Sequence, residues 1–220
     1  MTQDTKPKIA LVTGASRGLG AALAESLGAQ GWHVIALART LGALEELDDR
    51  IKAQGGNATL AAMDITQDNA MRHLCRGIHD RWGHLDLWVH TAIHAPPMSP
   101  ADHVALKDWD KCVAINIRAT GFLIPMVAPL LLAAPARATA LFIDDKVAGR
   151  KFMGAYGASK AAQMAMARAW AAETVKTGPR VLVEAAAPMP TATRARFYPG
   201  EDQSRLAPCA QEAARLTALL

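Results

Sequence analysis

Tyr156 and Lys160 are the two residues of this chain whose types and spacing best suit proton-transfer chemistry. They stand four positions apart, so on a helix their side chains lie on one face. A tyrosine hydroxyl has an ordinary pKa near 10 and exchanges protons poorly at neutral pH. A lysine cation beside it favours the phenolate and lowers that pKa, which would let the tyrosine exchange a proton with a carbonyl or alcohol oxygen. This spacing is common on helix surfaces, so the hypothesis depends on what accompanies it.

A glycine-rich segment near the N-terminus, TGASRGLG at 13–20, has the features of a phosphate-binding turn. Glycines adopt backbone torsions forbidden to other residues and let the main chain approach a pyrophosphate closely. The helix expected to follow directs free N–H groups and the positive end of its dipole at the phosphates. A plain strand–helix turn is the alternative, but the position after the first apolar run favours a dinucleotide site. The turn residues expected to contact the dinucleotide are Gly14, Ser16, Arg17, Gly18, Leu19 and Gly20.

The glycine-rich turn and the segment YGASK at 156–160 together resemble the motifs of the short-chain dehydrogenase/reductase family. The resemblance runs from about Lys8 to Arg194 and implies a Rossmann-type domain that binds NAD or NADP at the carboxyl ends of its strands. It also implies that Lys160 holds the nicotinamide ribose as well as tuning Tyr156. Asn116, in AINIRATG, matches the helix asparagine that holds a water in the family's proton relay. The alternative for Asn116 is an amide satisfied by a backbone carbonyl inside a helix.

The end of the second apolar run favours NADP(H) as the cofactor. An NAD site usually places a carboxylate there, where it accepts hydrogen bonds from the adenosine ribose. This chain has Arg39 and Thr40 instead, and no carboxylate before Glu45. A guanidinium at that place attracts a 2′-phosphate, and Arg17 resembles the second basic residue of NADP-preferring relatives. The alternative is that Arg39 is a solvated strand end.

The resemblance implies further cofactor contacts along the chain. Asp64 matches an aspartate near the adenine ring, although capping of the following helix is an alternative role. A threonine near 191 matches the region that contacts the nicotinamide carboxamide. The cofactor-binding residues expected outside the turn are Arg39, Thr40, Asp64, Ile65, Thr91, Ala92, Tyr156, Lys160, Pro188 and Thr191.

The family's active-site serine is missing. The fifth apolar run ends in Asp144-Asp145-Lys146, and no serine or threonine lies between Thr139 and Tyr156. Asp145 and Lys146 are both candidates for the serine's place. A lysine cation would stabilise an oxyanion and an aspartate would repel it, so Lys146 joins Tyr156, Lys160 and Asn116 as an expected catalytic residue. Two further departures are Ile93 and Met189, each in place of a family glycine.

The elements that must position these residues alternate along the chain. Six short runs rich in Val, Ile and Leu are separated by segments of helical period, and continuous hydrophobicity indicates strands covered on both faces. This pattern predicts a single domain over 1–220 with a doubly wound parallel α/β sheet and a shortened C-terminus. The last helix is expected at about 208–219. The expected strands are 8–13, 33–39, 57–64, 85–92, 138–145 and 179–186.

Composition limits the other functions. Lysine and arginine number 24 against 20 acidic residues, and this mild, scattered excess does not indicate nucleic-acid binding. The three cysteines are far apart and form no CxxC, so we expect no metal site and a reducing, cytoplasmic location. The uncharged stretch 119–136 has nearly the length of a membrane span, but three prolines interrupt it, so a buried or interface helix is expected.

The resulting hypothesis is an NADP(H)-dependent oxidoreductase that transfers a hydride between the nicotinamide and a small-molecule carbonyl or alcohol. Its rival is a dinucleotide-binding protein with little or no catalysis, acting as a sensor or assembly subunit. The segments 119–136 and 156–172 are more apolar than one-sided burial requires, which predicts a homodimer or homotetramer packed through them. The alternative is that the C-terminal helix covers this apolar surface.

Overall fold

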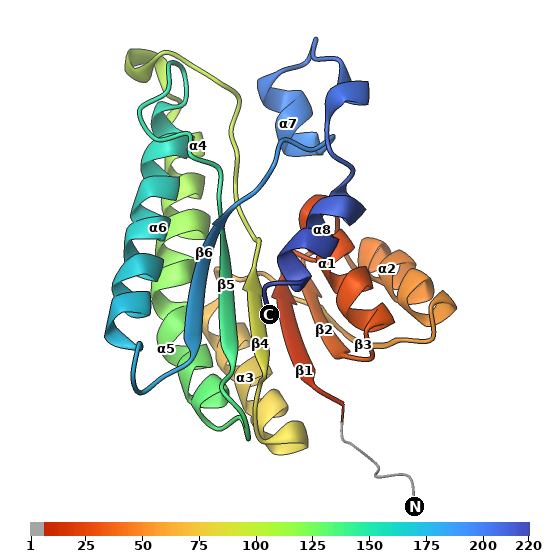
Figure 1. Ribbon diagram of the computed structural model, residues 1–220. Coiled ribbons are helices and arrows are strands. Elements are labelled where there is room, and N and C mark those ends of the chain that lie inside the picture. The colour runs from red at the N-terminus through yellow and green to blue at the C-terminus, as the bar shows by residue number, and fades with distance from the viewer. Residues whose placement is uncertain (1–6) are drawn as a thin grey trace, which may run out of the picture.

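Six parallel strands form the centre of the computed structural model, which describes residues 7–220 (Figure 1). Their order across the sheet is β3-β2-β1-β4-β5-β6, so the chain starts in the middle and winds outward in both directions. The six predicted strands are confirmed, each with ends shifted by no more than two residues. The strands are β1 (Ile9–Thr13), β2 (His33–Ala38), β3 (Asn57–Ala62), β4 (Leu87–His90), β5 (Thr139–Asp144) and β6 (Arg180–Ala185).

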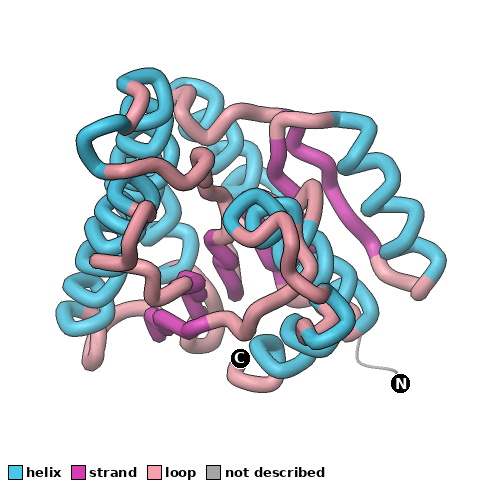
Figure 2. Tube along the Cα trace, turned by 90° about the horizontal axis from the view of Figure 1, so that it is seen from above, coloured by secondary structure: helices cyan, strands magenta, loops and turns pink. Residues whose placement is uncertain are grey.

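Helices cover both faces of the sheet, as a chain of continuous apolar strands requires. One face packs on α1, α2 and α8 and the other on α3, α5 and α6, and the view along the sheet shows the strands enclosed between the two layers (Figure 2). The doubly wound α/β fold is thus confirmed. The helices are α1 (Gly18–Ala29), α2 (Leu41–Ala53), α3 (Asp68–Trp82), α4 (Leu106–Cys112), α5 (Ala119–Leu132), α6 (Gly154–Glu173), α7 (Ala192–Phe197) and α8 (Cys209–Thr217).

Alternate residues of the central strands enter two separate cores. Ile9 and Leu11 of β1 pack with Trp88 in the core beneath α3, α5 and α6. Ala10 and Val12 point the other way, into the core beneath α1, α2 and α8. All five residues of β1 are buried, which explains why its sequence shows no alternation of apolar and polar residues.

One helical segment, Leu106–Leu132, is long and apolar enough to cross a membrane by length and composition alone. It runs from α4 through a π-helical turn, Val113–Arg118, into α5. Leu123 and Val127 are fully buried in the core beneath α5, so the sheet accounts for one side of its apolar surface. This is the packing expected of a core helix in an α/β domain.

The C-terminal helix α8 does not cover α5 and α6. It packs against α1 on the opposite face of the sheet, where Ala213 and Leu216 are fully buried. The alternative that this helix covers the apolar surface of the 119–136 and 156–172 segments is therefore wrong. The apolar side of α8 fills the core beside α1.

Candidate active site

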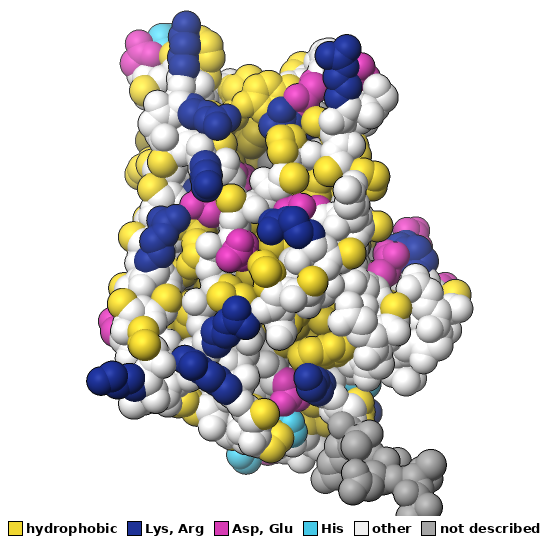
Figure 3. All heavy atoms as spheres, viewed as in Figure 1, with side chains coloured by type: hydrophobic (Ala, Val, Ile, Leu, Met, Phe, Trp, Pro, Cys, Tyr) yellow, Lys and Arg dark blue, Asp and Glu magenta, His cyan; other side chains and the backbone are white. Residues whose placement is uncertain are grey.

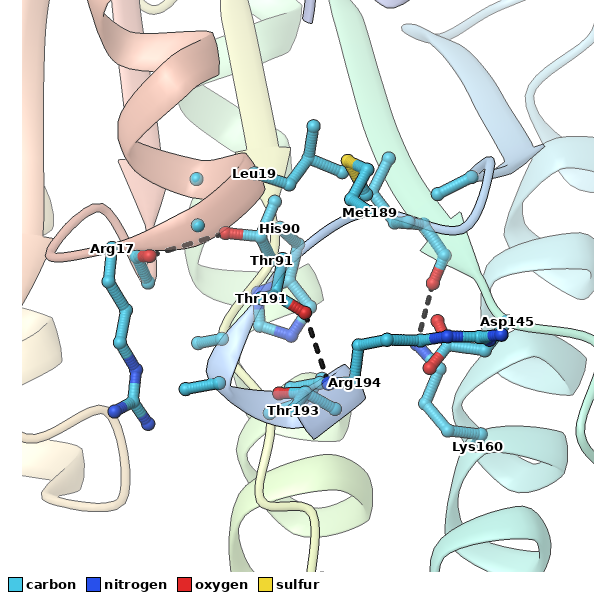
Figure 4. Close-up of a pocket in the computed structure, with 18 of the residues that line it drawn as sticks. Arg17, Leu19, His90, Thr91, Asp145, Lys160, Met189, Thr191, Thr193 and Arg194 are labelled. Carbon is cyan, nitrogen blue, oxygen red and sulfur yellow. Dashed lines mark hydrogen bonds between the residues drawn. The ribbon is translucent and has the colours of Figure 1, made fainter. Parts of the chain in front are cut away.

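A cavity of about 580 Å³ lies along the carboxyl ends of the strands, between the start of α1 and α7. Figure 4 shows Arg17 on one side of it and Asp145 and Lys160 on the other, with residues of α7 between them. The lining brings together most of the expected cofactor-binding and catalytic residues. Those found in the lining are Gly14, Ser16, Arg17, Gly18, Leu19, Gly20, Arg39, Asp64, Ile65, Thr91, Ala92, Lys146, Lys160, Pro188 and Thr191.

Three expected residues lie outside this lining. Thr40 is the residue before α2, and Asn116 and Tyr156 are buried behind the cavity wall. Ile93, which replaces a family glycine, is itself part of the wall.

The glycine turn is built for close contact between backbone segments. Gly14 has a φ of +87°, and a Cβ atom there would lie 2.7 Å from the backbone nitrogen of Ala92. A Cβ at Gly20 would lie 2.3 Å from the carbonyl oxygen of Gly14. Both distances are too short for any side chain, so β1, α1 and the segment after β4 meet here only because these residues are glycine.

The start of α1 fits a phosphate group. The helix begins at Gly18, and no side chain caps its first backbone N–H groups. Uncapped N–H groups and the helix dipole form an anion site. The exposed side chains of Arg17 and Arg39 stand at the same end of the cavity. These residues fit a dinucleotide, and the two guanidinium groups suit an additional phosphate on its adenosine ribose.

Asp64 holds the turn before α3 and lines the cavity, but it does not cap that helix, whose N-cap residue is Gln67. Its Oδ1 accepts hydrogen bonds from the Thr66 backbone nitrogen at 2.9 Å and from the Thr66 hydroxyl at 2.8 Å. These bonds fix the turn between β3 and α3. The residue also lines the cavity, next to Ile65.

Asp145, and not Lys146, faces the candidate catalytic tyrosine. The Tyr156 hydroxyl donates a hydrogen bond to Oδ2 of Asp145. Lys146 is exposed at the cavity rim, in a left-handed conformation with φ of 51°. The choice of Lys146 for the serine's place is therefore wrong in this structure, because the chain turns sharply after Asp144 and carries the lysine outward.

The surroundings of Tyr156 raise its pKa rather than lower it. Burial disfavours the phenolate, and the negative charge of the nearby Asp145 carboxylate repels it. Asp145 also accepts a hydrogen bond from the neutral hydroxyl, so the pKa of Tyr156 lies well above the ordinary value. Lys160 does not bond to the hydroxyl. Its ammonium donates to the Ile143 carbonyl at 2.6 Å and to Oε1 of Gln163 at 2.7 Å, and burial lowers its pKa. The expected activation of the phenol by the lysine is thus not seen.

Asn116 is fully engaged by protein groups. It lies in the π-helical turn before α5, where its Oδ1 accepts from the His94 backbone nitrogen at 2.7 Å. Its Nδ2 donates to the His94 carbonyl at 2.9 Å and to the Ser159 hydroxyl at 2.8 Å. The amide therefore ties the segment after β4 to α6. This is close to the alternative of an amide satisfied by backbone groups.

A buried row of polar side chains, which the sequence did not reveal, continues from Lys160 into the core. Gln163 Nε2 donates to the Thr120 hydroxyl at 2.9 Å, and that oxygen lies 3.0 Å from Nε2 of His90. His90 Nδ1 lies 2.7 Å from the Thr13 hydroxyl. The spacing of Gln163, three positions after Lys160 on one helix, was a signal that could have found its role.

His90 is neutral in this row. Thr120 donates its only hydroxyl proton to the Asn116 carbonyl at 3.0 Å, so His90 Nε2 donates to Thr120. The Thr13 hydroxyl lies 2.7 Å from His90 Nδ1 and 3.2 Å from the Val89 carbonyl, and its one proton serves either acceptor. Burial, with the Lys160 charge nearby, lowers the pKa of His90 to about 3. Its ring also forms part of the cavity floor (Figure 4).

Helix α7 closes the space over Tyr156. The Phe197 ring packs on the Tyr156 ring with centroids 5.2 Å apart, and Tyr156 is only 1% exposed. Thr191 caps α7 by accepting from the Arg194 backbone nitrogen at 3.1 Å. The Arg194 guanidinium is held by Glu201. Phe197 was missed because nothing in the sequence distinguishes an aromatic residue in a short helix that covers a site from one in any other surface segment.

Cationic side chains do not gather into one patch on the face that Figure 3 shows, where Lys and Arg are spread over the surface. Within residues 7–220, no group of three or more His, Cys, Asp or Glu side chains lies close enough to hold a metal ion.

Comparison with known proteins agrees with this geometry. The sequence model of the short chain dehydrogenase family matches residues 8–203. A fatty acyl-CoA reductase of Acinetobacter baylyi is 31% identical over 181 residues, which cover 79% of this chain and 60% of the reductase. This chain thus spans about three fifths of the length of that relative.

Solved structures match over most of the chain. A short chain dehydrogenase from Pseudomonas syringae has 30% identity and a TM-score of 0.88, covering 93% of this chain and 85% of that one. A short chain dehydrogenase from Shigella flexneri, solved in complex with NADP, has 29% identity and a TM-score of 0.86. That alignment covers 92% of this chain and 86% of the other.

Proposed function

The chain belongs to the short-chain dehydrogenase family, and on this basis we propose that it is an NADP(H)-dependent oxidoreductase of small molecules. The observation that carries the proposal is the cavity, which joins an uncapped helix N-terminus and two arginines to Lys160 and to Asp145, the hydrogen-bond partner of Tyr156. Carbonyls and alcohols are the substrate class that the family resemblance implies. When bound, the nicotinamide supplies or accepts the hydride.

The chain's own residues would hold the cofactor at both ends. The N–H groups at the start of α1 would bind the pyrophosphate, and Gly14 and Gly20 let the backbone come close. Lys160 lies at the other end of the cavity, where its ammonium would exchange the Ile143 carbonyl for ribose hydroxyls. Asn116 and Gln163 keep α6 and Lys160 in place.

The choice of NADP(H) over NAD(H) depends on Arg17 and Arg39. Both side chains are exposed at the phosphate end of the cavity, and neither forms an ion pair within residues 7–220. A free guanidinium gains more from a phosphate dianion than from a ribose hydroxyl. The NADP in the Shigella flexneri relative supports the same choice.

Titration of the purified protein with each cofactor tests this proposal. NADPH is expected to bind at least tenfold more tightly than NADH, equivalent to about 1.4 kcal/mol. Arg39→Ala should weaken NADPH binding and leave NADH binding unchanged, because only the 2′-phosphate is affected. Arg76→Ala, at an exposed site on α3, is the matched control. Equal affinities for the two cofactors would refute NADP(H) preference.

A dinucleotide-binding protein with little catalysis is the second candidate, favoured by the burial of Tyr156 beneath Phe197. NADPH oxidation across a panel of aldehydes, ketones, quinones and imines distinguishes the two. NADPH-dependent turnover of any compound in the panel supports the enzyme. Tight NADPH binding without turnover of any compound supports the binding protein.

A further inference from the structure

Asp145 is an unpaired carboxylate at the catalytic end of the cavity. It is half-buried, it lines the cavity, and one of its oxygens accepts a hydrogen bond from the Tyr156 hydroxyl. Across residues 7–220 the structure gives it no ion pair, whereas its neighbour Asp144 is paired with Arg168 at 2.7 Å. The buried Lys160 ammonium is also directed elsewhere, to the Ile143 carbonyl and Gln163. The carboxylate is therefore free to bind a ligand.

A carboxylate at this position is unsuited to a carbonyl substrate. Reduction of a carbonyl places negative charge on oxygen, and Asp145 would repel that charge. The Tyr156 hydroxyl has one proton, and it already donates that proton in a hydrogen bond to Asp145. The hydroxyl is therefore not free to donate to a carbonyl oxygen. A protonated carbon–nitrogen double bond suits this carboxylate, because it carries a positive charge and an N–H group that can donate a hydrogen bond to Asp145.

We propose that the reacting group bound by Asp145, one of whose oxygens accepts a hydrogen bond from Tyr156, is a protonated carbon–nitrogen double bond, so that the protein reduces cyclic or substituted imines in preference to carbonyls. This inference rests on the proposed NADP(H)-dependent function. The iminium carbon receives a hydride from NADPH, which becomes NADP⁺, and the C=N π pair moves onto nitrogen as a lone pair. The product is a neutral amine, and no proton from Tyr156 is consumed in that step.

The rest of the cavity wall is compatible with a cationic nitrogen. The aromatic ring of Phe197 lines the cavity beside Tyr156, and the face of an aromatic ring attracts organic cations. The Arg194 guanidinium is already neutralised by Glu201. Lys146 and Arg150 also line the cavity, but both are exposed, so solvent screens their charges more than that of the half-buried Asp145.

Calorimetric binding of matched amines and ethers tests the inference without turnover. The probes are piperidine against tetrahydropyran, and 1,2,3,4-tetrahydroisoquinoline against isochroman; each amine is protonated at neutral pH and its partner has oxygen in place of NH₂⁺. With NADP⁺ bound, wild type should bind each amine at least tenfold more tightly than the ether. Asp145→Asn should remove this preference without weakening ether binding, because the amide keeps the shape and loses the charge.

Asp144→Asn is the matched control, since it removes a carboxylate one position away whose charge is already paired. It should leave the amine preference within twofold of wild type. Steady-state rates give a second measurement. Wild type should reduce 3,4-dihydroisoquinoline with at least tenfold higher kcat/KM than 1-tetralone, and Asp145→Ser should reverse that order.

Three results overturn the inference: equal binding of amine and ether, an amine preference unchanged in Asp145→Asn, or no binding of either amine. NADP⁺ binding is measured first in the same instrument. Its absence refutes the proposed function separately, and the amine titrations are then made on the cofactor-free protein, where the same effect of Asp145→Asn is expected.

Discussion

At the scale of single residues, His90 shows how strongly the core beside the cavity selects one protonation state. Its ring is buried between the hydroxyls of Thr13 and Thr120, which lie 2.7 and 3.0 Å from its two nitrogens. A second proton would place a positive charge in the buried core near Lys160. The folded protein therefore resists protonation at a position that the unfolded chain protonates readily.

This difference predicts a loss of stability in mild acid. The pKa of His90 is about 3 in the folded state against an ordinary 6.5, so as pH falls below 6.5 the unfolded chain gains a proton that the folded one does not. Between pH 7 and pH 5 the free energy of unfolding should fall by about 2 kcal/mol from this group. His90→Gln should lack this part of the pH dependence, as measured by urea unfolding at both pH values.

His33 and His94, whose pKa values burial also lowers, are present in both proteins and cancel in the comparison. If the free energy of unfolding falls equally in wild type and His90→Gln between pH 7 and pH 5, His90 is protonated in the folded state. The variant is expected to be less stable at both pH values, so only the difference between them is diagnostic.

At Asp145 and Lys146, the sequence could not predict which side chain faces Tyr156. The motif positions predicted the Tyr156–Lys160 face of α6, since a helix fixes which side chains share a face. The orientation of the two residues after β5 was not predictable. It depends on the left-handed conformation of Lys146, which is unusual for a lysine and has no signal in the residue types.

At the scale of elements, the segment after β6 connects the cavity to the far side of the sheet. The loop from Ala185 to Thr191 forms one wall of the cavity. Helix α8 supports this loop through Glu212, which is 3% exposed and accepts from the Ala187 backbone nitrogen at 3.0 Å. Arg215 pairs with the same carboxylate at 2.7 Å and holds its pKa below the ordinary value. A helix on one face thus fixes a wall of the site.

Glu212→Ala should therefore lower both stability and cofactor affinity. Loss of the carboxylate leaves the Ala187 N–H without its partner, at a cost of about 1–3 kcal/mol in unfolding free energy. Denaturant unfolding and NADPH titration measure the two effects. Glu212→Gln keeps an acceptor and should recover most of both, while Glu46→Ala, at an exposed site on α2, should change neither. Unchanged NADPH affinity in Glu212→Ala would show that the loop does not need α8.

The sequence predicted which helices and strands form better than it predicted how they pack against one another. Each strand was evident from its apolar run, and the fold class followed from the alternation of strands and helices. The helix at 208–219 was also evident, but its pattern shows only that one side is apolar. Which face of the sheet it covers depends on the path of the chain through α7, and no local pattern encodes that path.

At the scale of the whole molecule, the outer sides of α5 and α6 form a largely uncharged surface, with Arg168 and Glu173 as its exposed charges. We call it the α5–α6 surface. Helix α8 lies on the opposite face of the sheet and does not cover it. Small residues on α6 would let a second helix pair approach closely. Its exposed or half-buried members are Gly121, Phe122, Ile124, Pro125, Met126, Ala128 and Pro129 on α5, and Ala158, Ala161, Ala162, Ala165, Met166 and Ala169 on α6.

A two-fold dimer through the α5–α6 surface is therefore expected, because each copy would bury the apolar side chains of the other. Light scattering of the purified protein at micromolar concentration should give at least twice the 23.4 kDa of one chain. Ala165→Glu, in the middle of the exposed side of α6, should place two like charges close together across the interface and shift the mass to that of the monomer. Ala53→Glu, an exposed alanine near the end of α2, adds the same charge elsewhere and should leave the dimer intact. A wild-type mass of one chain would refute the dimer, and a dimer that persists in Ala165→Glu would place its interface on another surface.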